Sequence, residues 1–292
     1  MNNKLSVIIC TRNRADQLDR CLRRLEEADA PPGGWELIVV DNNSSEHTKQ
    51  VVQRASKALP LQYYFEGKEG HSRARNLGLE RAAGSIIAYT DDDCLVSRTW
   101  MTSLVREFEN DATLEVLGGR VDQANERDLP MAIRSFSDRL QISSFGQIIE
   151  RLIGCNMAFR RRVFATVGTF DTKLGSGTRS ASSEDTDIFY RVLKAGFKTC
   201  FSPDVLIHHA HNRDTLEAAR SVKDNYLKGR GAVYCKYILR CDGVILRHAL
   251  DEIEWLVKAA FAHRPADGVL YDPSRALFYL AIGALYRLSG RG

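Results

Sequence analysis

Three adjacent carboxylates, Asp91, Asp92 and Asp93, directly follow a short apolar run in the sequence. Neighbouring negative charges repel one another unless a cation balances them, and a divalent metal ion is the natural counter-charge. Residues two apart in an extended chain face the same way, so Asp91 and Asp93 could converge on one ion and its phosphates. A solvated turn or a helix cap is the alternative explanation. At the end of a strand, however, the triplet favours a metal and phosphate site.

Two further segments carry groups that suit a nucleotide. Asp41 follows the apolar run 36–40, where its carboxylate can hydrogen-bond a base or a ribose. Arg73 and Arg75 lie at the start of a predicted helix, where guanidinium and backbone N–H groups suit an anion. An exposed helical arginine is otherwise a solvated charge. These two segments therefore indicate a nucleotide site only in combination with the acidic triplet.

A second acidic group consists of Glu184, Asp185 and Asp187, which begin a predicted amphipathic helix after the small, polar loop 175–183. Acidic residues in a first turn favour the helix dipole, which explains part of this charge without any chemistry. Three carboxylates exceed what a cap needs. A carboxylate beside a flexible loop can serve as a general base toward a hydroxyl, and this is the role that the segment suggests.

Three histidines, His208, His209 and His211, follow the apolar run 205–207. A neutral imidazole at a strand end can ligate a metal ion, although this spacing does not place all three rings on one ion. A packed or surface histidine is the alternative explanation. The cluster is therefore a candidate source of one metal ligand.

These side chains need a scaffold that brings strand ends together. Apolar, β-branched runs alternate with helical patterns along the first part of the chain, which predicts a doubly wound, mainly parallel α/β sheet. Ligands of such sheets gather at the carboxyl ends of the strands, where the polar segments 11–14, 41–45 and 91–93 lie. The stretch 122–150 is less regular, and the chain is helical from Thr215 onward. The predicted strands are 5–10, 35–40, 61–65, 85–90 and 114–121, and the predicted helices are 15–28, 47–59, 72–83, 100–110 and 188–193.

The composition is that of a globular protein. The 292 residues fit one large α/β domain with a helical appendage, and 44% hydrophobic against 27% charged residues can bury a substantial core. A net charge of +4 is too small to indicate nucleic acid as a partner. The seven cysteines are never spaced as CxxC, which favours reduced thiols and a cytoplasmic location. The sequence shows neither a signal-peptide core nor a run of about 18 apolar residues, so we expect any membrane contact to be peripheral.

In their order along residues 4–212, these motifs make the chain resemble the family 2 glycosyltransferases, which have the GT-A fold. The resemblance rests on segments that are weak singly and specific in this order. These segments are 7–14, 36–44, 72–79, 84–93, 154–161 and 167–171, together with Glu184, Asp185, Arg191 and Gly196.

The resemblance implies a role for each matching residue. Asp91 and Asp93 look like the DxD motif of the family, which reaches the ribose and the metal, and Asp185 matches the acid usually taken as the base. A metal or diphosphate contact six residues after a proline falls on His209, counted from Pro203, with His208 in reserve. The donor-binding residues would be Thr11, Arg12, Arg14, Asp41, Arg75, Asp91 and Asp92, the metal ligands Asp93, Asp91 and His209, and the acceptor-side residues Asn156 and Glu184.

The implied activity is inverting transfer of a sugar from a nucleotide diphosphate sugar to an acceptor hydroxyl, with Mn²⁺ or Mg²⁺ as cofactor. A UDP-sugar is favoured, although Cys10-Thr11-Arg12-Asn13 replaces the Pro-Thr-Tyr-Asn of many members. The acceptor would be a saccharide or a lipid-linked compound of glycoconjugate synthesis. A sugar-1-phosphate nucleotidyltransferase and a catalytically silent nucleotide-sugar-binding protein are the alternatives.

We expect a catalytic domain over residues 1–214 and a helical extension over 215–292. Within the catalytic domain, residues 1–110 would bind the nucleotide sugar and 111–214 would face the acceptor. The apolar segment Arg275 to Arg287 has basic ends and could lie in the membrane interface, on the inner face of the cell membrane. Packing on the catalytic domain or on a second subunit is the alternative.

Overall fold

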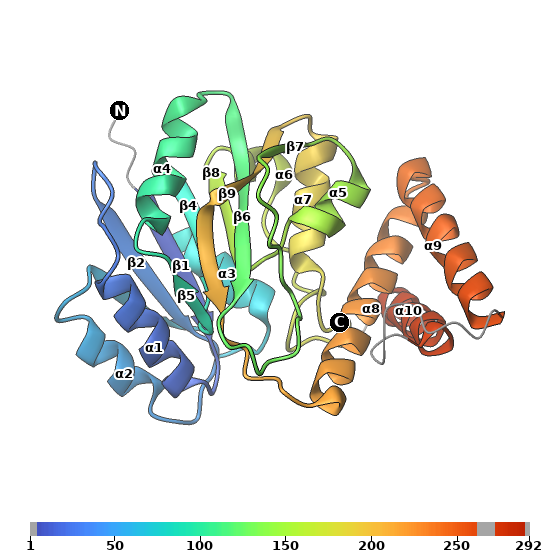
Figure 1. The fold of residues 1–292 in the computed structure, drawn as a ribbon, viewed down its shortest axis with the longest axis horizontal. Coiled ribbons are helices and arrows are strands. Elements are labelled where there is room, and N and C mark those ends of the chain that lie inside the picture. The colour runs from blue at the N-terminus through green and yellow to red at the C-terminus, as the bar shows by residue number, and fades with distance from the viewer. Residues whose placement is uncertain (1–4, 262–271, 290–292) are drawn as a thin grey trace.

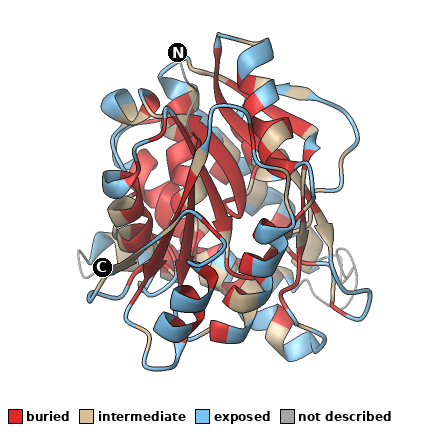
Figure 2. Ribbon diagram, turned by 90° about the vertical axis from the view of Figure 1, so that its left-hand side faces the viewer, coloured by how far each residue is buried: buried red, intermediate tan, exposed pale blue. Residues whose placement is uncertain are grey.

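The computed structural model describes residues 5–261 and 272–289. A central sheet is flanked by helices, and three C-terminal helices stand beside it, on the right in Figure 1. The strands of the sheet are buried along most of their length, whereas exposed residues lie on the outer helices and the loops (Figure 2).

The N-terminal strands are parallel, as the sequence predicts, and they lie in the order β3-β2-β1-β4. Successive residues of β1 point to opposite faces. Val7 and Ile9 pack against α1 and α2, and Ile8 and Cys10 pack against α3, so helices cover both faces. The strands are β1 (Leu5–Thr11), β2 (Trp35–Asp41), β3 (Leu61–Phe65) and β4 (Ile86–Asp91), and the helices are α1 (Ala15–Glu26), α2 (Thr48–Ala55) and α3 (His71–Arg81).

The other part of the sheet is mixed rather than mainly parallel. β8 lies antiparallel between β4 and β6, β6 pairs parallel with β9, and β5 and β7 pair antiparallel with β9. The parallel prediction therefore holds for the N-terminal strands, and the insertion of β8 makes the whole sheet mixed. These elements are β5 (Cys94–Val96), α4 (Trp100–Asn110), β6 (Leu114–Gln123), β7 (Leu140–Ile142), α5 (Phe145–Arg151), β8 (Asn156–Arg160), α6 (Val163–Val167), α7 (Glu184–Lys194) and β9 (Lys198–His209).

The C-terminal part is helical, as predicted, with α8 (Leu216–Ile238), α9 (Gly243–Phe261) and α10 (Pro273–Leu288). The backbones of α8 and α10 touch at two glycines. A Cβ on Gly231 would lie 2.0 Å from the Leu280 oxygen, and a Cβ on Gly283 would lie 1.8 Å from the Lys228 oxygen. The apolar segment predicted at 275–287 thus packs on α8 through one face. None of the helices in the described part of the chain combines the length and apolar character that a membrane span requires.

A buried charge network joins α8 to α7. Lys236 Nζ donates to Asp187 Oδ1 at 2.5 Å and to Asp171 Oδ2 at 2.8 Å. The Tyr237 hydroxyl donates to the same Asp187 oxygen at 3.0 Å, and Arg191 pairs with the other. Asp187 has no exposed surface, so its charge is balanced entirely by these neighbours.

Candidate functional site

One cavity of about 630 Å³ opens at the carboxyl ends of the parallel strands. The ends of β1 and β4 and the start of α3 line one side, the start of α7 lies between, and α8 lines the other side. We name the two sides after the roles that the sequence predicts, the first side as the donor end and the α8 side as the acceptor end. The lining includes Thr11, Arg12, Arg14, His71, Arg75, Asp91, Asp92, Asp93, Gly154, Glu184, Asp185, His209, Arg134, Arg213, Tyr226 and Arg230.

The acidic triplet spans the end of β4 and the turn into β5. Thr11 donates to Asp92 Oδ2 at 2.7 Å, and Arg14 reaches Asp92 at 3.1 Å and Asp93 at 2.6 Å. Burial raises the pKa of Asp92 to about 7, against the opposing charge of Arg14. Because Asp92 and Asp93 lie in a turn, the strand alternation used for Asp91 and Asp93 does not describe their directions.

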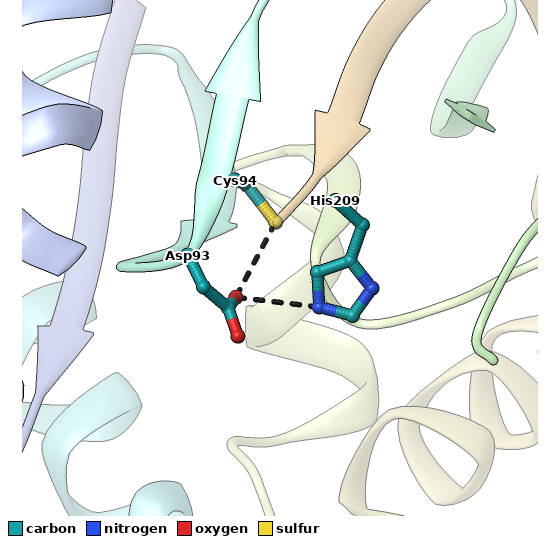
Figure 3. Close-up of side chains that lie close together, drawn as sticks. All are labelled: Asp93, Cys94 and His209. Atoms are coloured by element: carbon teal, nitrogen blue, oxygen red, sulfur yellow. Dashed lines mark hydrogen bonds and ion pairs between the residues drawn. The ribbon is translucent and has the colours of Figure 1, made fainter. Parts of the chain in front are cut away.

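A candidate metal centre lies beside this turn. The ligand atoms of Asp93, Cys94 and His209 lie within 4.8 Å of one another, and Figure 3 shows the side chains pointing toward one another, Asp93 from the turn before β5, Cys94 from β5 and His209 from the end of β9. His209 Nε2 is 3.3 Å from Asp93 Oδ1. Burial lowers the pKa of His209, but the hydrogen bond and charge of Asp93 outweigh it and raise the pKa to about 9.

The donor set of this group fits a divalent cation that also binds phosphate oxygens. The carboxylate and the imidazole provide an oxygen and a nitrogen ligand, whereas burial raises the pKa of the Cys94 thiol and disfavours the thiolate form that binds metals. His209 lines the cavity whereas His208 does not, so the structure favours His209 of the two candidates.

Asp91 lies with a different set of partners. Arg75, only 2% exposed, donates to Asp91 at 3.3 Å and to Glu184 at 2.9 Å. His71 lies one helical turn before Arg75, with Nδ1 3.2 Å from Glu184 and Nε2 3.8 Å from Asp91. Arg75 and His71 thus connect Asp91, at the end of β4, to Glu184, at the start of α7. Within the described residues, the group of potential ligand atoms around His209 contains Asp93 but not Asp91.

The pKa values of His71 and Glu184 in this cluster shift in opposite directions, and in both cases the neighbouring groups outweigh burial. Burial lowers the pKa of His71, but its hydrogen bonds and the carboxylates of Glu184 and Asp91 outweigh it and raise the pKa to about 10. Burial raises the pKa of Glu184, but the hydrogen bond from His71 and the charge of Arg75 lower it to about 2. Glu184 is therefore a charged structural partner rather than a proton acceptor at neutral pH.

Asp185 is placed differently from its neighbour. The backbone N–H groups of Gly154 and Thr186 each donate to one of its oxygens at 2.7 Å. A Cβ at Gly154 would lie 3.0 Å from Asp185 Oδ2 and 2.9 Å from Arg75 Nη2, so a side chain there would crowd both groups. Burial raises the pKa of Asp185, and the adjacent Glu184 charge raises it further. A carboxylate with a raised pKa suits general base catalysis.

Two candidates from the sequence, Asp41 and Asn156, lie outside the cavity lining. Asp41 accepts hydrogen bonds from the Ser44 N–H and the Tyr63 hydroxyl, both at 2.8 Å, and does not line the cavity. Asn156 accepts from Trp100 and donates to the Arg120 and Val205 carbonyls, and it too lies outside the lining. Both side chains hold neighbouring backbone and side chains together. Arg12 does line the cavity and pairs with Glu69.

Several lining residues are absent from the candidates chosen by sequence. The sequence motifs do not single out His71, although its spacing of four from Arg75 places both on one helix face. Arg134 lies in the irregular segment, Arg213 lies in the segment between β9 and α8, and Tyr226 and Arg230 belong to α8. No local motif marks these four residues, because the tertiary fold alone brings them to the cavity.

Known proteins with similar sequences or folds are consistent with this geometry. The chain matches the family described as Glycosyl transferase family 2 over residues 6–168, more than half of its length. Glycosyltransferase AglE of Haloferax volcanii is 29% identical over 277 residues, which cover 93% of this chain and 85% of that protein. A GalNAc(5)-diNAcBac-PP-undecaprenol beta-1,3-glucosyltransferase of Campylobacter jejuni is 38% identical over 93 residues, 31% of this chain and 29% of that protein.

A solved structure supports the fold. Mannosyltransferase PcManGT from Pyrobaculum calidifontis, in complex with GDP-Man and Mn²⁺, superposes with a TM-score of 0.66 at 20% identity. The superposition covers 99% of this chain and 88% of that one. The match over residues 6–168, the full-length relative and the shared architecture lead to one conclusion: the chain belongs to glycosyl transferase family 2 and is a glycosyltransferase with the GT-A fold.

Proposed function

We propose that this glycosyltransferase moves a sugar from a nucleotide diphosphate sugar to an acceptor hydroxyl with inversion at the anomeric carbon. The observation that carries the proposal is the arrangement within one cavity. A carboxylate and imidazole pair, Asp93 and His209, lies at the donor end, and Asp185 with its raised pKa lies between the two ends.

The donor end supplies groups for the nucleotide diphosphate. Asp93 and His209 would hold Mn²⁺ or Mg²⁺, whereas Asp91, which lies outside their group of ligand atoms, would contact the donor. Thr11, Arg12, Arg14, Arg75 and Asp92 would contact the nucleotide and the diphosphate, and Asp41 would act on the base through the loop that it orders. When bound, the ion would neutralise charge that develops on the departing diphosphate. We favour a UDP-sugar, and a GDP-sugar is the nearest competitor because PcManGT was solved with GDP-Man.

The chain's own residues account for the proton transfer. Asp185 would accept the proton of the acceptor hydroxyl while that oxygen attacks the anomeric carbon from the face opposite the leaving diphosphate. The Gly154 and Thr186 N–H groups fix the direction of this carboxylate. Arg75, held over the rings of Tyr89 and Phe170, keeps Asp91 and Glu184 in place. A single displacement of this kind inverts the configuration of the sugar.

The acceptor is proposed to be a saccharide or a lipid-linked compound of glycoconjugate synthesis. The name of the Campylobacter relative describes transfer to a PP-undecaprenol-linked saccharide. The lining of the cavity continues past Asp185 to Tyr226 and Arg230 of α8, which supports an acceptor of this kind.

A donor screen tests the proposal. Nucleotide diphosphate sugars with different bases are added with Mn²⁺ or Mg²⁺, and the melting temperature and donor hydrolysis are measured. One donor should raise the melting temperature in the presence of the metal, because a ligand of the native state stabilises it. Binding without any hydrolysis or transfer would favour a silent binding protein. Release of pyrophosphate from a nucleoside triphosphate and a sugar 1-phosphate would favour a nucleotidyltransferase.

The C-terminal helices are proposed to contact a membrane surface. An exposed apolar stripe on α9, with spacings of four, three, four and four, consists of Leu246, Leu250, Ile253, Val257 and Phe261. Such a stripe suits a lipid interface, and a second copy of the chain is the competing occupant. The full chain should float with phospholipid vesicles, and the double variant Leu250→Glu/Ile253→Glu should not. Equal flotation of both proteins, or a dimer in place of flotation, would contradict the membrane contact.

A further inference from the structure

The two ends of the cavity differ in how their charges are balanced. At the donor end each carboxylate of the triplet pairs with a basic side chain, through Arg14, Arg75 or His209. At the acceptor end the lining contains Arg134, Arg213 and Arg230 with the aromatic ring of Tyr226. Asp185, the carboxylate between the two ends, already accepts two backbone hydrogen bonds.

Arg134 is a guanidinium held by neutral groups. Its Nη1 and Nη2 donate to the carbonyls of Ile133 and Ile149 at 2.8 and 3.0 Å. Its Nε is buried without a hydrogen-bond partner, and no carboxylate in the described ranges pairs with it. Burial lowers the pKa of Arg134, the charge of Asp185 acts to raise it, and the charge of Arg230 acts to lower it. Arg134 and Arg230 therefore place two like charges in the lining of one cavity.

Arg213 approaches from the segment that joins β9 to α8. Its backbone is fixed, because its N–H donates to His211 Nδ1 at 3.1 Å and its carbonyl accepts from the Leu129 N–H at 2.9 Å. Its side chain lines the cavity and forms no ion pair within residues 5–261 and 272–289. Arg230 differs, since Glu252 of α9 holds its Nη1 at 2.5 Å. Arg134 and Arg213 thus leave two positive charges without a carboxylate partner beside Asp185.

We propose that Arg134, Arg213 and Arg230 form a subsite for a phosphate or diphosphate group of the acceptor. Guanidinium groups bind phosphate oxygens through pairs of charge-assisted hydrogen bonds, and two unbalanced guanidinium groups in a cavity favour an anionic ligand. The acceptor class that follows is a phosphorylated compound whose hydroxyl reaches Asp185 while its phosphate lies against the arginines. This inference rests on the proposed sugar transfer and adds the chemical class of the acceptor to it.

The test uses the full chain with its donor end filled. UDP or GDP is added with Mn²⁺ at saturation, so that a second anion cannot use the same place. Octyl phosphate is then added below its micelle concentration, with octyl glucoside as the neutral probe and inorganic phosphate as the soluble anion. The melting temperature of the wild type should rise with octyl phosphate and rise less, or not at all, with octyl glucoside.

Variants assign the effect to the subsite. Arg213→Gln should weaken octyl phosphate binding by roughly tenfold or more, because it removes charge-assisted hydrogen bonds from a partly buried site. Arg213→Lys should restore part of the affinity. Arg127→Gln is the matched control, since this exposed arginine lies on the same segment as Arg134 but outside the cavity lining. It should respond to octyl phosphate as the wild type does.

The outcomes separate the two proposals. If neither nucleotide with Mn²⁺ raises the melting temperature, the proposed donor function fails before any acceptor probe is added. If the nucleotide response is normal but octyl phosphate acts no better than octyl glucoside, the phosphate subsite is wrong. If Arg213→Gln loses the nucleotide response instead, the arginine serves the donor diphosphate and the acceptor subsite is again wrong. An equal response to inorganic phosphate supports the subsite and identifies a soluble phosphate as its source.

Discussion

The donor end and the acceptor end of the cavity differ in how the charges of their side chains are balanced. At the donor end acidic and basic side chains are paired within the protein, and Arg75 joins β4 to α7 through Asp91 and Glu184. At the acceptor end Arg134 and Arg213 have no carboxylate partner among the described residues. The first arrangement is organised before a ligand arrives, whereas the second leaves charge for the ligand to complete. The comparison predicts that changes at the two ends affect binding of different substrates.

Asp185 lies between the ends, so its replacement should have the largest effect. Asp185→Asn should lower sugar transfer by roughly 10²- to 10⁴-fold, because a general base is removed. The rise in melting temperature on adding the nucleotide sugar and Mn²⁺ should stay close to that of the wild type. Transfer above a tenth of the wild-type rate would show that another group takes the proton.

His209 tests the donor end alone. His209→Gln should weaken Mn²⁺-dependent donor binding by about tenfold, which equals about 1.4 kcal/mol. The matched control is His208→Gln, because that neighbouring ring does not line the cavity. Titration of Mn²⁺ with the donor present, followed by melting temperature, measures both. Identical behaviour of the two variants would remove His209 from the metal centre.

The pH dependence of transfer tests Asp185, which lies between the two ends of the cavity. Burial and the Glu184 charge raise the pKa of Asp185, and only the deprotonated carboxylate can accept a proton. Transfer should therefore fall as the pH is lowered through a value above the ordinary carboxyl range. In Glu184→Gln this acid limb should move to lower pH, since a like charge is removed. A limb at the same pH in both proteins would contradict the coupling.

The smallest expected effect concerns the stability contributed by Asp171, which lies outside both ends of the cavity. The pKa of Asp171 falls to about 2, because the hydrogen bond and charge of Lys236 outweigh burial. A lowered pKa in the folded state adds stability above about pH 4 that is lost as the pH falls toward 2. Asp171→Asn should remove roughly 1–2 kcal/mol of this pH-dependent stability. Denaturant unfolding at pH 7 and pH 3 measures it, and equal losses in both proteins would contradict the assignment.

The sequence predicted the donor end better than the acceptor end. Strands 5–10 and 35–40 each pair with the strand that follows one helix later, so local apolar patterns identify them. The family motifs lie on the same strand ends. The direction of β8 was not predictable, because it depends on contacts with β4 and β6 that are distant in sequence.

The roles of individual residues were predictable only where their partners are close in the chain. Asp41 and Asn156 sit within predicted motifs, yet Tyr63 and Trp100 engage their side chains inside the protein. The assignment of Arg134 to the cavity required the fold, since its neighbourhood comes from α7 and α8. Sequence patterns identify a polar side chain at a strand end, but they do not identify the protein groups that already form hydrogen bonds with it.

The buried Asp187 has a consequence for how this chain could be recombined with its relatives. The expected catalytic domain ends at residue 214, but Lys236 and Tyr237, which hold Asp187, lie on α8. A chimera joined at that point would keep Arg191 beside a carboxylate that has no exposed surface and lose the other two groups. Breaking a buried pair costs about 3–5 kcal/mol, a large fraction of the stability of a typical domain. Helices with new acceptor preferences can therefore be grafted only when they bring a cation to Asp187.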